Sequence, residues 1–342
     1  MNDPVCLADF EHLAQARLPK GVWDFIAGGS GAETTLAANR AALDAVALLP
    51  RVLVGVETPD TSCQLLKSEA SMPVATAPMA YQRLAHPDGE LAMASAARDA
   101  GIPFLLSTFS TVAIEDVVAV GGTVWFQLYW LRQRALVEEL VGRAEESGCQ
   151  AMVVTVDVPV LGRRLRDARN DFQVPPDVLA ANLPDATVTT EDYLSPVVSW
   201  PDLEWLRERT TLPLVVKGVL DPRDAVRAIG LGADAVVVSN HGGRQLDGAA
   251  SSAAALPAVV DAVAGQGEVL LDSGIRDGTD VLRALALGAS GVLLGRPLLW
   301  GLAVAGAEGA AQVLRLLLEE LRTALRIAGC PTPAAARALT VL

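Results

Sequence analysis

The segment Ala235-Val236-Val237-Val238-Ser239-Asn240-His241-Gly242-Gly243-Arg244-Gln245-Leu246-Asp247 changes abruptly from an apolar run to a polar turn. An apolar run of this length is typical of a buried parallel strand. The two glycines allow the backbone to turn tightly and to approach a ligand closely. His241 and Arg244 then place a titratable base beside a permanent cation. That pair suits the removal of a proton from a molecule whose carboxylate is held by arginine.

The same order of apolar run and polar turn recurs from Met72 onward. Eight such runs end at Ala77, Ser107, Tyr129, Thr155, Lys217, Ser239, Asp272 and Leu294. Helical patterns lie between several of them, over 89–100, 133–147, 222–230 and 278–287. This alternation predicts an α/β fold, a closed (β/α)8 TIM barrel. The alternative, a doubly wound open sheet, needs a glycine fingerprint after its first strand, and the sequence has none there.

The first 70 residues lack this repeat. Their patterns predict helices over 9–17, 20–27 and 32–43, followed by extended and loop segments. The cluster Gly28-Gly29-Ser30-Gly31 follows a helical pattern, so it is interpreted as a helix stop and not as a nucleotide-binding loop. We therefore expect an N-terminal helical extension, residues 1–70, packed on one barrel, residues 71–342, that includes the C-terminal helix. The interval 156–211 must hold a long loop as well as a helix.

The composition describes an acidic globular chain. Its 342 residues are 51% hydrophobic, and the formal net charge of -13 argues against nucleic acid or an anionic membrane surface as a partner. The start of the sequence lacks a signal-peptide pattern, and no apolar run approaches the roughly 20 residues of a membrane span. The four cysteines lie far apart without metal-ligand or redox spacing. Reduced thiols, a cytoplasmic location and no metal site are therefore expected.

Polar side chains gather where the predicted strands end, which is where the active sites of barrels lie. Because side chains alternate along a strand, Gln127 and Tyr129 face one side together, and so do Thr155 and Asp157. Few of these groups would be tolerated in a purely structural core. The other strand ends carry Pro78, Met79, Ala80 and Tyr81, then Ser107, Lys217, Ser239 with His241, Asp272, and Gly295 with Arg296.

Two glycine-containing turns follow the last two predicted strands, at 272–276 and 295–297. Loops at these positions of a barrel often bind phosphate, and Arg276 and Arg296 would add positive charge. Lys217 is one of only three lysines among 27 basic residues. A cation at that strand end would stabilise the negative charge that an isoalloxazine ring gains on reduction. The run 162–170 carries four arginines, which predicts an anion-binding arginine in the loop after Asp157.

Together these segments resemble the family of FMN-dependent α-hydroxy acid oxidases and dehydrogenases, which includes glycolate oxidase. The resemblance extends from about residue 7 to residue 329 and is strongest over 239–247. Segments 81–84, 125–132 and 163–170 are most similar to members that oxidise 4-hydroxymandelate. The matching segments are Arg51, 77–78, 86–90, 126–129, 155–157, 162–164, 216–218, 239–247 and 295–297.

The resemblance implies a role for each matching residue. His241 would be the catalytic base, and Asp157 would stabilise the imidazolium that forms. Arg164, Arg244 and the Tyr129 hydroxyl would bind the substrate carboxylate, and Lys217 would face the N1 and O2 edge of FMN. The ring and ribityl chain would contact Ala77, Pro78, Met79, Ala80, Ser107, Gln127, Thr155 and Ser239. The ribityl tail and phosphate would contact Asp272, Gly274, Arg276, Gly295 and Arg296.

The implied reaction oxidises an (S)-2-hydroxy acid to the 2-oxo acid, with oxygen as the acceptor and hydrogen peroxide as a product. Phe25 occupies a substrate-binding position where many members have tyrosine, which favours an aromatic acid such as mandelate or 4-hydroxymandelate. Phe109 and Ser273 also depart from the common pattern. An aliphatic acid such as lactate or glycolate, and a dehydrogenase with a non-oxygen acceptor, are the alternatives. The base could remove either the Cα proton or the hydroxyl proton of the substrate. A homotetramer is expected from the resemblance.

Overall fold

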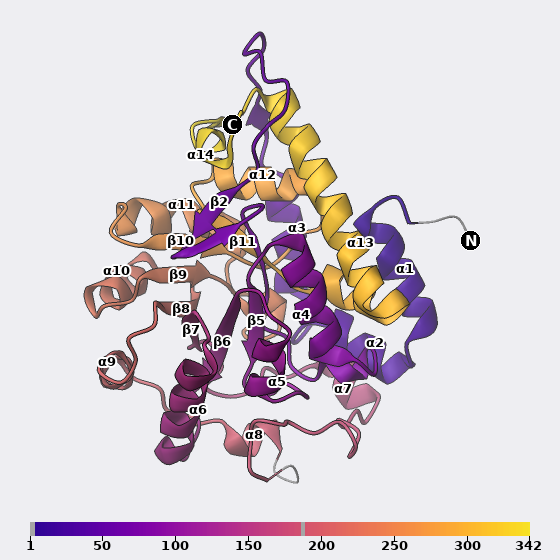
Figure 1. Ribbon diagram of the computed structural model, residues 1–342, viewed down its shortest axis with the longest axis vertical. Coiled ribbons are helices and arrows are strands. Elements are labelled where there is room, and N and C mark those ends of the chain that lie inside the picture. Colours follow the sequence, from indigo (N-terminus) through magenta and orange to yellow (C-terminus); the bar gives the residue numbers. More distant parts are fainter. Residues whose placement is uncertain (1–3, 186–188) are drawn as a thin grey trace.

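The computed structural model describes residues 4–185 and 189–342. Its centre is one sheet of eight strands, hydrogen-bonded in the order β4-β11-β10-β9-β8-β7-β6-β5 (Figure 1). The two ends of this sheet meet, because Thr76 N donates to Pro103 O at 3.0 Å and Leu105 N donates to Thr76 Oγ1 at 2.8 Å. The predicted (β/α)8 barrel is thereby confirmed. The strands are β4 (Val74–Thr76), β5 (Phe104–Ser107), β6 (Val124–Tyr129), β7 (Ala151–Thr155), β8 (Leu214–Val219), β9 (Ala235–Val238), β10 (Glu268–Leu271) and β11 (Gly291–Leu294).

Neighbouring barrel strands are parallel, and their ends agree closely with the predicted ones. The largest difference is in β8, which continues past Lys217 to Val219. Gly218 lies between them with a φ of 107°, and the pairing register with β9 shifts there. A bulge of this kind extends the strand without continuing its regular ladder.

Helices form the outer layer of the barrel and follow local signals in the sequence. The side chains of Asp221 and Asp277 accept hydrogen bonds from backbone N–H groups at the starts of two helices, and Gly101 and Gly148 end two others in the left-handed conformation. The helices are α4 (Gly89–Ala100), α5 (Ile114–Ala119), α6 (Arg134–Ser147), α9 (Trp200–Arg207), α10 (Pro222–Gly230), α11 (Ser252–Val263), α12 (Gly278–Ala286) and α13 (Arg296–Ala328).

Helix α13 is longer than the sequence patterns indicated. It contains 33 residues and is interrupted by non-helical dihedral angles at Ala305 and Gly306. By length and composition it is the one helix in the described parts of the chain that could cross a membrane, although half of its most apolar window is buried. It packs along α4, α12 and the N-terminal helix α1 (Leu7–Arg17). Its apolar side therefore belongs to the core between these helices.

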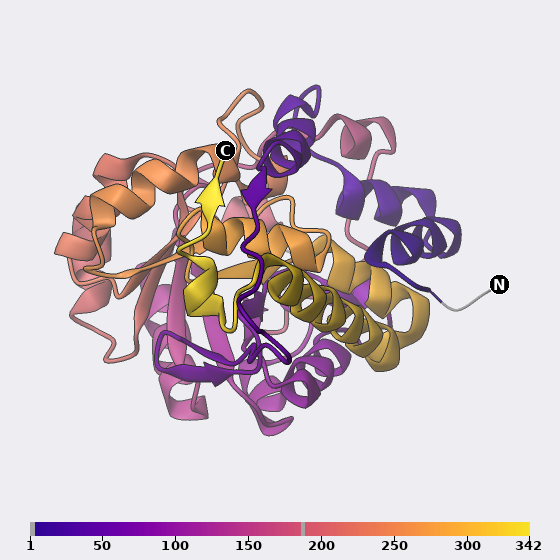
Figure 2. The same cartoon turned by 90° about the horizontal axis from the view of Figure 1, so that it is seen from above.

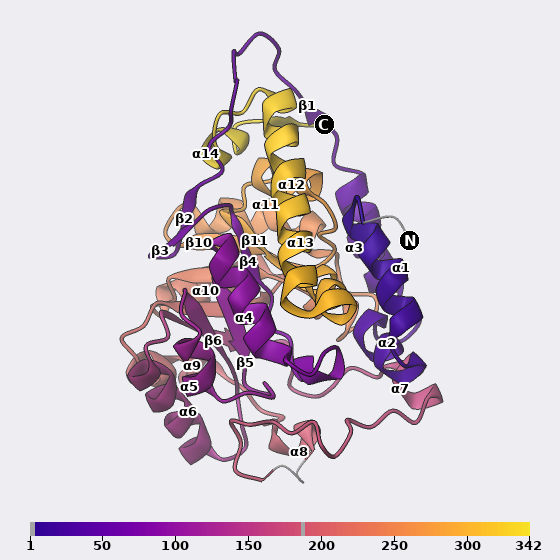
Figure 3. The ribbon, with the colours of Figure 1, turned by 45° about the vertical axis from the view of Figure 1, so that its right-hand side comes forward.

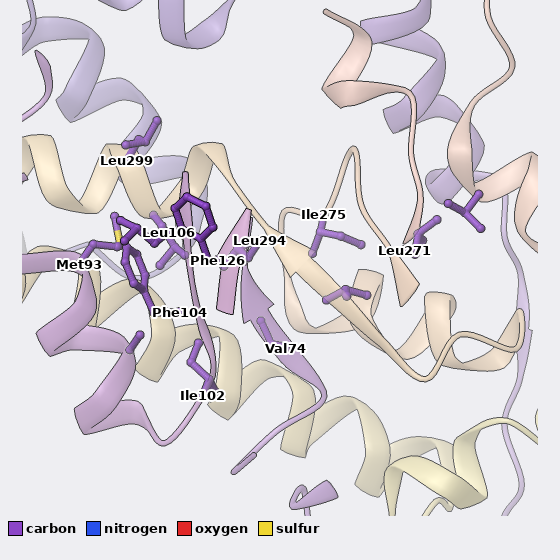
Figure 4. Close-up of a cluster of buried hydrophobic side chains, with 14 of the residues drawn as sticks. Val74, Met93, Ile102, Phe104, Leu106, Phe126, Leu271, Ile275, Leu294 and Leu299 are labelled. Atoms are coloured by element: carbon purple, nitrogen blue, oxygen red, sulfur yellow. The ribbon is translucent and has the colours of Figure 1, made fainter. Parts of the chain in front are cut away.

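Two buried apolar clusters stabilise the barrel. The smaller cluster includes Ala75, Leu105 and Trp125, which alternate with residues of the larger cluster along their strands. In the larger cluster, Phe104 and Phe126 pack with side chains of the outer helices (Figure 4). Both faces of the strands are thus buried, which explains why the strands are almost continuously apolar.

The N-terminal segment is joined to the barrel at several places. Helices α1 and α2 (Lys20–Ala27) lie beside α13 (Figure 3), whereas α3 (Thr34–Asp44) packs against α11 and α12. The bounds of all three agree with the predicted helices. Strand β1 (Leu48–Leu49) pairs with the C-terminal strand β12 (Thr340–Val341), as Figure 2 shows. The hairpin of β2 (Cys63–Leu65) and β3 (Ser68–Ala70) contacts the barrel where Trp125 Nε1 donates to Ser68 Oγ at 3.2 Å. Gly28 ends α2, as expected for a helix stop.

Candidate active site

A cavity of about 1030 Å³ lies at the C-terminal ends of the barrel strands. Pockets for one drug-sized ligand measure about 300–1,000 Å³, so this one can hold a large cofactor and a small substrate together. Asp157, Ser107, Gln127, Thr155 and Ser239 lie outside its immediate lining. The predicted site residues in the lining are Phe25, Ala77, Pro78, Met79, Ala80, Tyr129, Arg164, Lys217, His241, Arg244, Asp272, Gly274, Arg276, Gly295 and Arg296.

His241 follows β9 in an unusual backbone conformation. It begins the short 3-10 helix η2 (His241–Gly243) with a φ of 59°, in the left-handed region that non-glycine residues rarely adopt. The side-chain oxygen of Asn240 accepts a hydrogen bond from Gly243 N at 3.0 Å. The amides of Asn240 and Asn39 exchange two further hydrogen bonds, at 2.7 and 2.9 Å. Such conformations cost on the order of 1–3 kcal/mol and occur mainly where the surroundings enforce them, often at functional sites.

The imidazole of His241 lies between a carboxylate and a phenol. Its Nδ1 is 3.0 Å from Asp157 Oδ1, and its Nε2 is 3.5 Å from the Tyr129 hydroxyl. Burial lowers the pKa of His241 below its ordinary value, although the charge of Asp157 opposes this shift. Burial alone would raise the pKa of Asp157, but the charge and hydrogen bond of His241 lower it. A neutral imidazole beside a carboxylate can accept a proton and be stabilised afterwards.

Gly218 makes room for this carboxylate. A Cβ atom at position 218 would lie 2.6 Å from Asp157 Cβ, which is closer than real Cβ contacts come. The positive φ of Gly218 also disfavours any L side chain there. The bulge in β8 therefore lets Asp157 pack against the strand while its Oδ1 faces His241.

Two arginines stack on one aromatic ring in the cavity. The guanidinium carbons of Arg164 and Arg244 lie 5.7 and 5.1 Å from the centre of the Phe25 ring. Arg244 NH1 donates to the carbonyl oxygens of Phe25 and Gly28, at 2.6 and 2.9 Å, which fixes the side chain at the end of α2. Arg164 Nε is buried without a hydrogen-bond partner among the residues that the structure describes.

The electrostatics of this arginine pair favour an anion. Burial and the charges of Arg164 and Arg296 lower the pKa of Arg244 well below its ordinary value. Burial also lowers the pKa of Arg164. The carboxylate of Asp167, whose Oδ2 lies 3.9 Å from Arg164 NH1, therefore compensates only in part for the burial of these two cations. A carboxylate ligand would supply the missing charge and the missing acceptor for Arg164 Nε.

Lys217 holds a positive charge at the cavity wall. Its Nζ lies 3.0 Å from Asp272 Oδ2 and donates to Ser239 Oγ at 3.1 Å. Burial alone would lower the pKa of Lys217, but the charges of Asp272 and Asp157, together with the hydrogen bond to Asp272, outweigh this effect and raise it. The ammonium group therefore stays charged. A fixed cation at this point can stabilise negative charge on a bound ring.

The turns after β10 and β11 supply two further buried cations. Burial is the main cause that lowers the pKa of Arg276 to about 10, against the charge of Glu11, and that of Arg296 to about 9. Arg296 Nε donates to Ile26 O and its NH2 to Gly28 O, each at 3.0 Å. Gly274 has a φ of 99°, so the turn passes close to α3 without a side chain in the way. Uncompensated buried cations beside a glycine turn suit a phosphate group.

Three polar side chains form a chain across neighbouring strands behind the lining. Ser107 Oγ donates to Gln127 Oε1 at 3.2 Å, and Gln127 Nε2 donates to Thr155 Oγ1 at 3.1 Å. All three residues are almost completely buried. Their contact with a cofactor stays a prediction, since they lie outside the cavity lining.

The residues present therefore fit FMN. Arg276 and Arg296 are unneutralised cations for its phosphate, and Lys217 provides a charged group for its ring. The cavity also has the volume for the cofactor together with a substrate beside His241.

The structure adds cavity residues to which the sequence analysis gave no role. Phe172 stacks on Phe25 with ring centres 5.0 Å apart, and the ring of Phe109 lies 5.5 Å from that of Tyr129. No motif or periodicity indicates that the loop after β7, with α7 (Leu165–Arg169) and α8 (Thr190–Tyr193), folds back over the strand ends. Its cavity residues include Leu161, Phe172, Val174, Pro175, Leu179, Leu183, Thr190 and Tyr193.

Comparisons with known proteins agree with this site. Residues 14–341 match the model of the family described as FMN-dependent dehydrogenase. The chain is 50% identical to the 4-hydroxymandelate oxidase of Amycolatopsis orientalis, with 98% of this chain and 97% of the relative covered. It is 46% identical to the L-lactate oxidase of Nostoc sp. (strain PCC 7120 / SAG 25.82 / UTEX 2576), with 96% of each covered. A crystal structure of mandelate oxidase with (S)-4-hydroxymandelic acid is 49% identical, has a TM-score of 0.95 and covers 99% of each chain. The chain therefore belongs to the FMN-dependent dehydrogenase family, among the 2-hydroxy acid oxidases.

Proposed function

We propose that the protein oxidises an aromatic (S)-2-hydroxy acid, mandelate or 4-hydroxymandelate, to the 2-oxo acid, and that oxygen is the electron acceptor and is converted to hydrogen peroxide. One observation carries this proposal. His241, which is paired with Asp157 at 3.0 Å, lines a cavity together with two arginines that stack on the Phe25 ring. The site thus combines a base, a carboxylate-binding pair and an aromatic wall.

The arginine pair positions the substrate. Arg164 and Arg244 bind its carboxylate, since Arg164 Nε lacks a partner within the described residues and Asp167 compensates only in part for the burial of both cations. The Tyr129 hydroxyl lies 3.5 Å from His241 Nε2, so it can contact the substrate beside the base. Burial raises the pKa of Tyr129 to about 12, and the hydroxyl therefore remains a hydrogen-bond donor.

The base then removes a proton. His241 Nε2 faces the Tyr129 side of the cavity, while Nδ1 contacts Asp157, which stabilises the imidazolium. Oxidation removes two electrons and two protons from the hydroxy acid. His241 takes one proton; FMN, when bound, would supply the acceptor for the two electrons and the second proton, and oxygen would take up both electrons and both protons as hydrogen peroxide. Lys217 contributes the positive charge that stabilises the reduced state.

Aromatic and apolar side chains support the choice of an aromatic substrate. Phe25 packs on Phe172 at 5.0 Å, and Phe109 packs on Tyr129 at 5.5 Å. A phenyl ring binds such walls through apolar burial and edge or stacked contacts. The similarity to the 4-hydroxymandelate oxidase of Amycolatopsis orientalis supports the same choice.

An aliphatic 2-hydroxy acid is the second candidate. The identity of 46% to an L-lactate oxidase favours it, because that relative shares nearly the whole chain. A non-oxygen acceptor is a further alternative for the second half of the reaction.

Anaerobic mixing distinguishes these candidates. The purified protein with FMN is mixed with (S)-mandelate, (S)-4-hydroxymandelate or glycolate while flavin absorbance is recorded, with (R)-mandelate as the control. We expect rapid bleaching by the two (S)-aromatic acids, followed by recovery of colour and stoichiometric hydrogen peroxide when oxygen is admitted. Bleaching by glycolate alone would refute the aromatic substrate. Bleaching without reoxidation by oxygen would refute the oxidase and favour a dehydrogenase.

Assembly and location are also proposals. We propose a homotetramer, supported by exposed apolar side chains at the C-terminal end of α13 and on the loop that packs there: Ile327 of the helix is 70% exposed, and Val52 and Leu53 of the loop are 81% and 101% exposed. Light scattering after size exclusion tests this. We also propose a cytoplasmic location, which the four free cysteines support. Fractionation of the source cells tests that.

A further inference from the structure

All three tyrosines of the chain line the cavity, but their hydroxyl groups differ in their partners. The Tyr129 hydroxyl lies beside His241. The Tyr193 hydroxyl donates to Asp185 O at 2.9 Å and accepts from Asp185 N at 3.0 Å, so backbone groups occupy it. The Tyr81 hydroxyl has one partner in the described parts of the chain, Thr190 Oγ1 at 2.7 Å. The role of that hydroxyl pair is not explained by the chemistry at His241.

The pair retains unused hydrogen-bonding capacity. Two hydroxyl groups carry two hydrogens, and the bond between Tyr81 and Thr190 uses only one of them. Neither hydroxyl oxygen has another partner among the described residues. Burial raises the pKa of Tyr81, so its hydroxyl stays protonated. One donor and several lone pairs are therefore available at the cavity wall, where a ligand group can satisfy them.

Aromatic rings connect this pair with the base. Tyr129 and Phe109 have ring centres 5.5 Å apart, and Phe109 and Tyr81 have ring centres 6.2 Å apart. Backbone contacts hold this order, since Tyr81 N donates to Phe109 O at 3.0 Å and Tyr81 has a φ of 55°. A substrate ring that packs along this wall has its carboxylate end at Tyr129 and its far end toward Tyr81 and Thr190.

We propose that Tyr81 and Thr190 recognise a hydroxyl group at the para position of the substrate ring and so make the enzyme selective for 4-hydroxymandelate over mandelate. This inference rests on the proposed function, because it requires an aromatic 2-hydroxy acid in the cavity. The phenolic hydroxyl donates to one oxygen of the pair and accepts the hydrogen that the pair leaves free. A phenyl ring without this hydroxyl leaves that hydrogen unpaired, which disfavours its binding.

The test is the ratio of kcat/KM for (S)-4-hydroxymandelate to kcat/KM for (S)-mandelate. We expect a ratio above one in the wild type and a decrease of about two- to tenfold in Tyr81→Phe and in Thr190→Val, the effect of one neutral hydrogen bond. Tyr193→Phe is the matched control, because it removes a hydroxyl from the same cavity that is already occupied by backbone groups. Its ratio should equal that of the wild type.

Two further readouts separate a specific effect from a structural one. The FMN content and Tm of each variant report folding, and Thr190→Val keeps the test decisive if Tyr81→Phe folds poorly. Ratios within twofold of the wild type in both variants, or an equal decrease in Tyr193→Phe, would overturn the inference. Failure of the wild type to oxidise either aromatic acid would instead refute the proposed function, and this inference with it.

Discussion

Asp157→Asn removes the negative charge beside the proposed base and preserves the size of the side chain. His241 becomes positively charged when it takes the substrate proton, so the transition state gains a charge that the resting enzyme lacks. Asp157 Oδ1 lies 3.0 Å from His241 Nδ1, and the two side chains are 13% and 18% exposed. The substitution therefore acts mainly on the transition state and less on substrate binding.

The magnitude follows from Coulomb's law. Two unit charges about 4 Å apart interact by about 4 kcal/mol at an effective dielectric constant of about 20. Each 1.36 kcal/mol changes a rate about tenfold, so we expect flavin reduction to slow by about a thousandfold. The charge of Asp157 also raises the pKa of His241, so its loss lowers that pKa further and moves the acidic limb of the pH profile to lower pH.

Anaerobic stopped-flow absorbance measures this step without any electron acceptor. Wild type and Asp157→Asn are mixed with increasing (S)-mandelate, which separates the limiting reduction rate from the concentration needed to saturate it. That concentration should change little, because Arg164 and Arg244 are intact. Asp99→Asn is the control, since it removes an equal charge from a carboxylate that is 61% exposed on α4. A limiting rate for Asp157→Asn within tenfold of the wild type would refute the assigned role.

Three other predictions concern the charge at the flavin, the pH profile and the loops around the cavity. Lys217→Met leaves Asp272 buried without its partner at 3.0 Å, so it should destabilise the protein by roughly 3–5 kcal/mol and weaken FMN retention. Urea unfolding and flavin release measure these two effects, and unchanged values would exclude the pair as a stabilising element. The pKa of folded His241 lies below 6.5 and the base acts when neutral, so kcat/KM should stay constant down to pH 6.5 and fall only as the pH drops through the lowered pKa. An acidic limb of the pH profile above pH 6.5 would contradict this. Glu90 is fully buried and accepts two backbone N–H bonds, at 2.9 and 3.1 Å, so Glu90→Ala should cost roughly 2–6 kcal/mol of stability. Glu90→Gln keeps one carbonyl oxygen and should cost less, and equal losses in Tm would count against this explanation.

Much of the candidate site was predictable because barrel geometry converts sequence position into location. In parallel strands the polar groups that follow each apolar run reach the same rim, so Tyr129, Lys217 and His241 meet although they come from different strands. The ends of the barrel strands followed from the apolar runs, and the bounds of several helices followed from helical periodicity and, for α2, from a glycine stop. The assignment of FMN and of a 2-hydroxy acid required the family resemblance.

The remaining features depend on contacts between segments far apart in the chain. The Asn39–Asn240 amide pair, the carbonyl groups of α2 that bind Arg244 and Arg296, and the loop after β7 have no local signal. The φ of 107° at Gly218 and the close approach of Asp157 emerge only when β7 and β8 pair.

The amino-acid sequence by itself determined the barrel, the rim at which polar groups converge and the chemical types of those groups, because these follow from strand periodicity and from the burial of apolar runs. Only the tertiary structure decided how the N-terminal helices and the loop after β7 close over that rim. It thereby joined Phe25 to the two arginines and Tyr81 to Thr190. The physical reason is that such contacts depend on the relative placement of whole segments, which local propensity and periodicity do not specify.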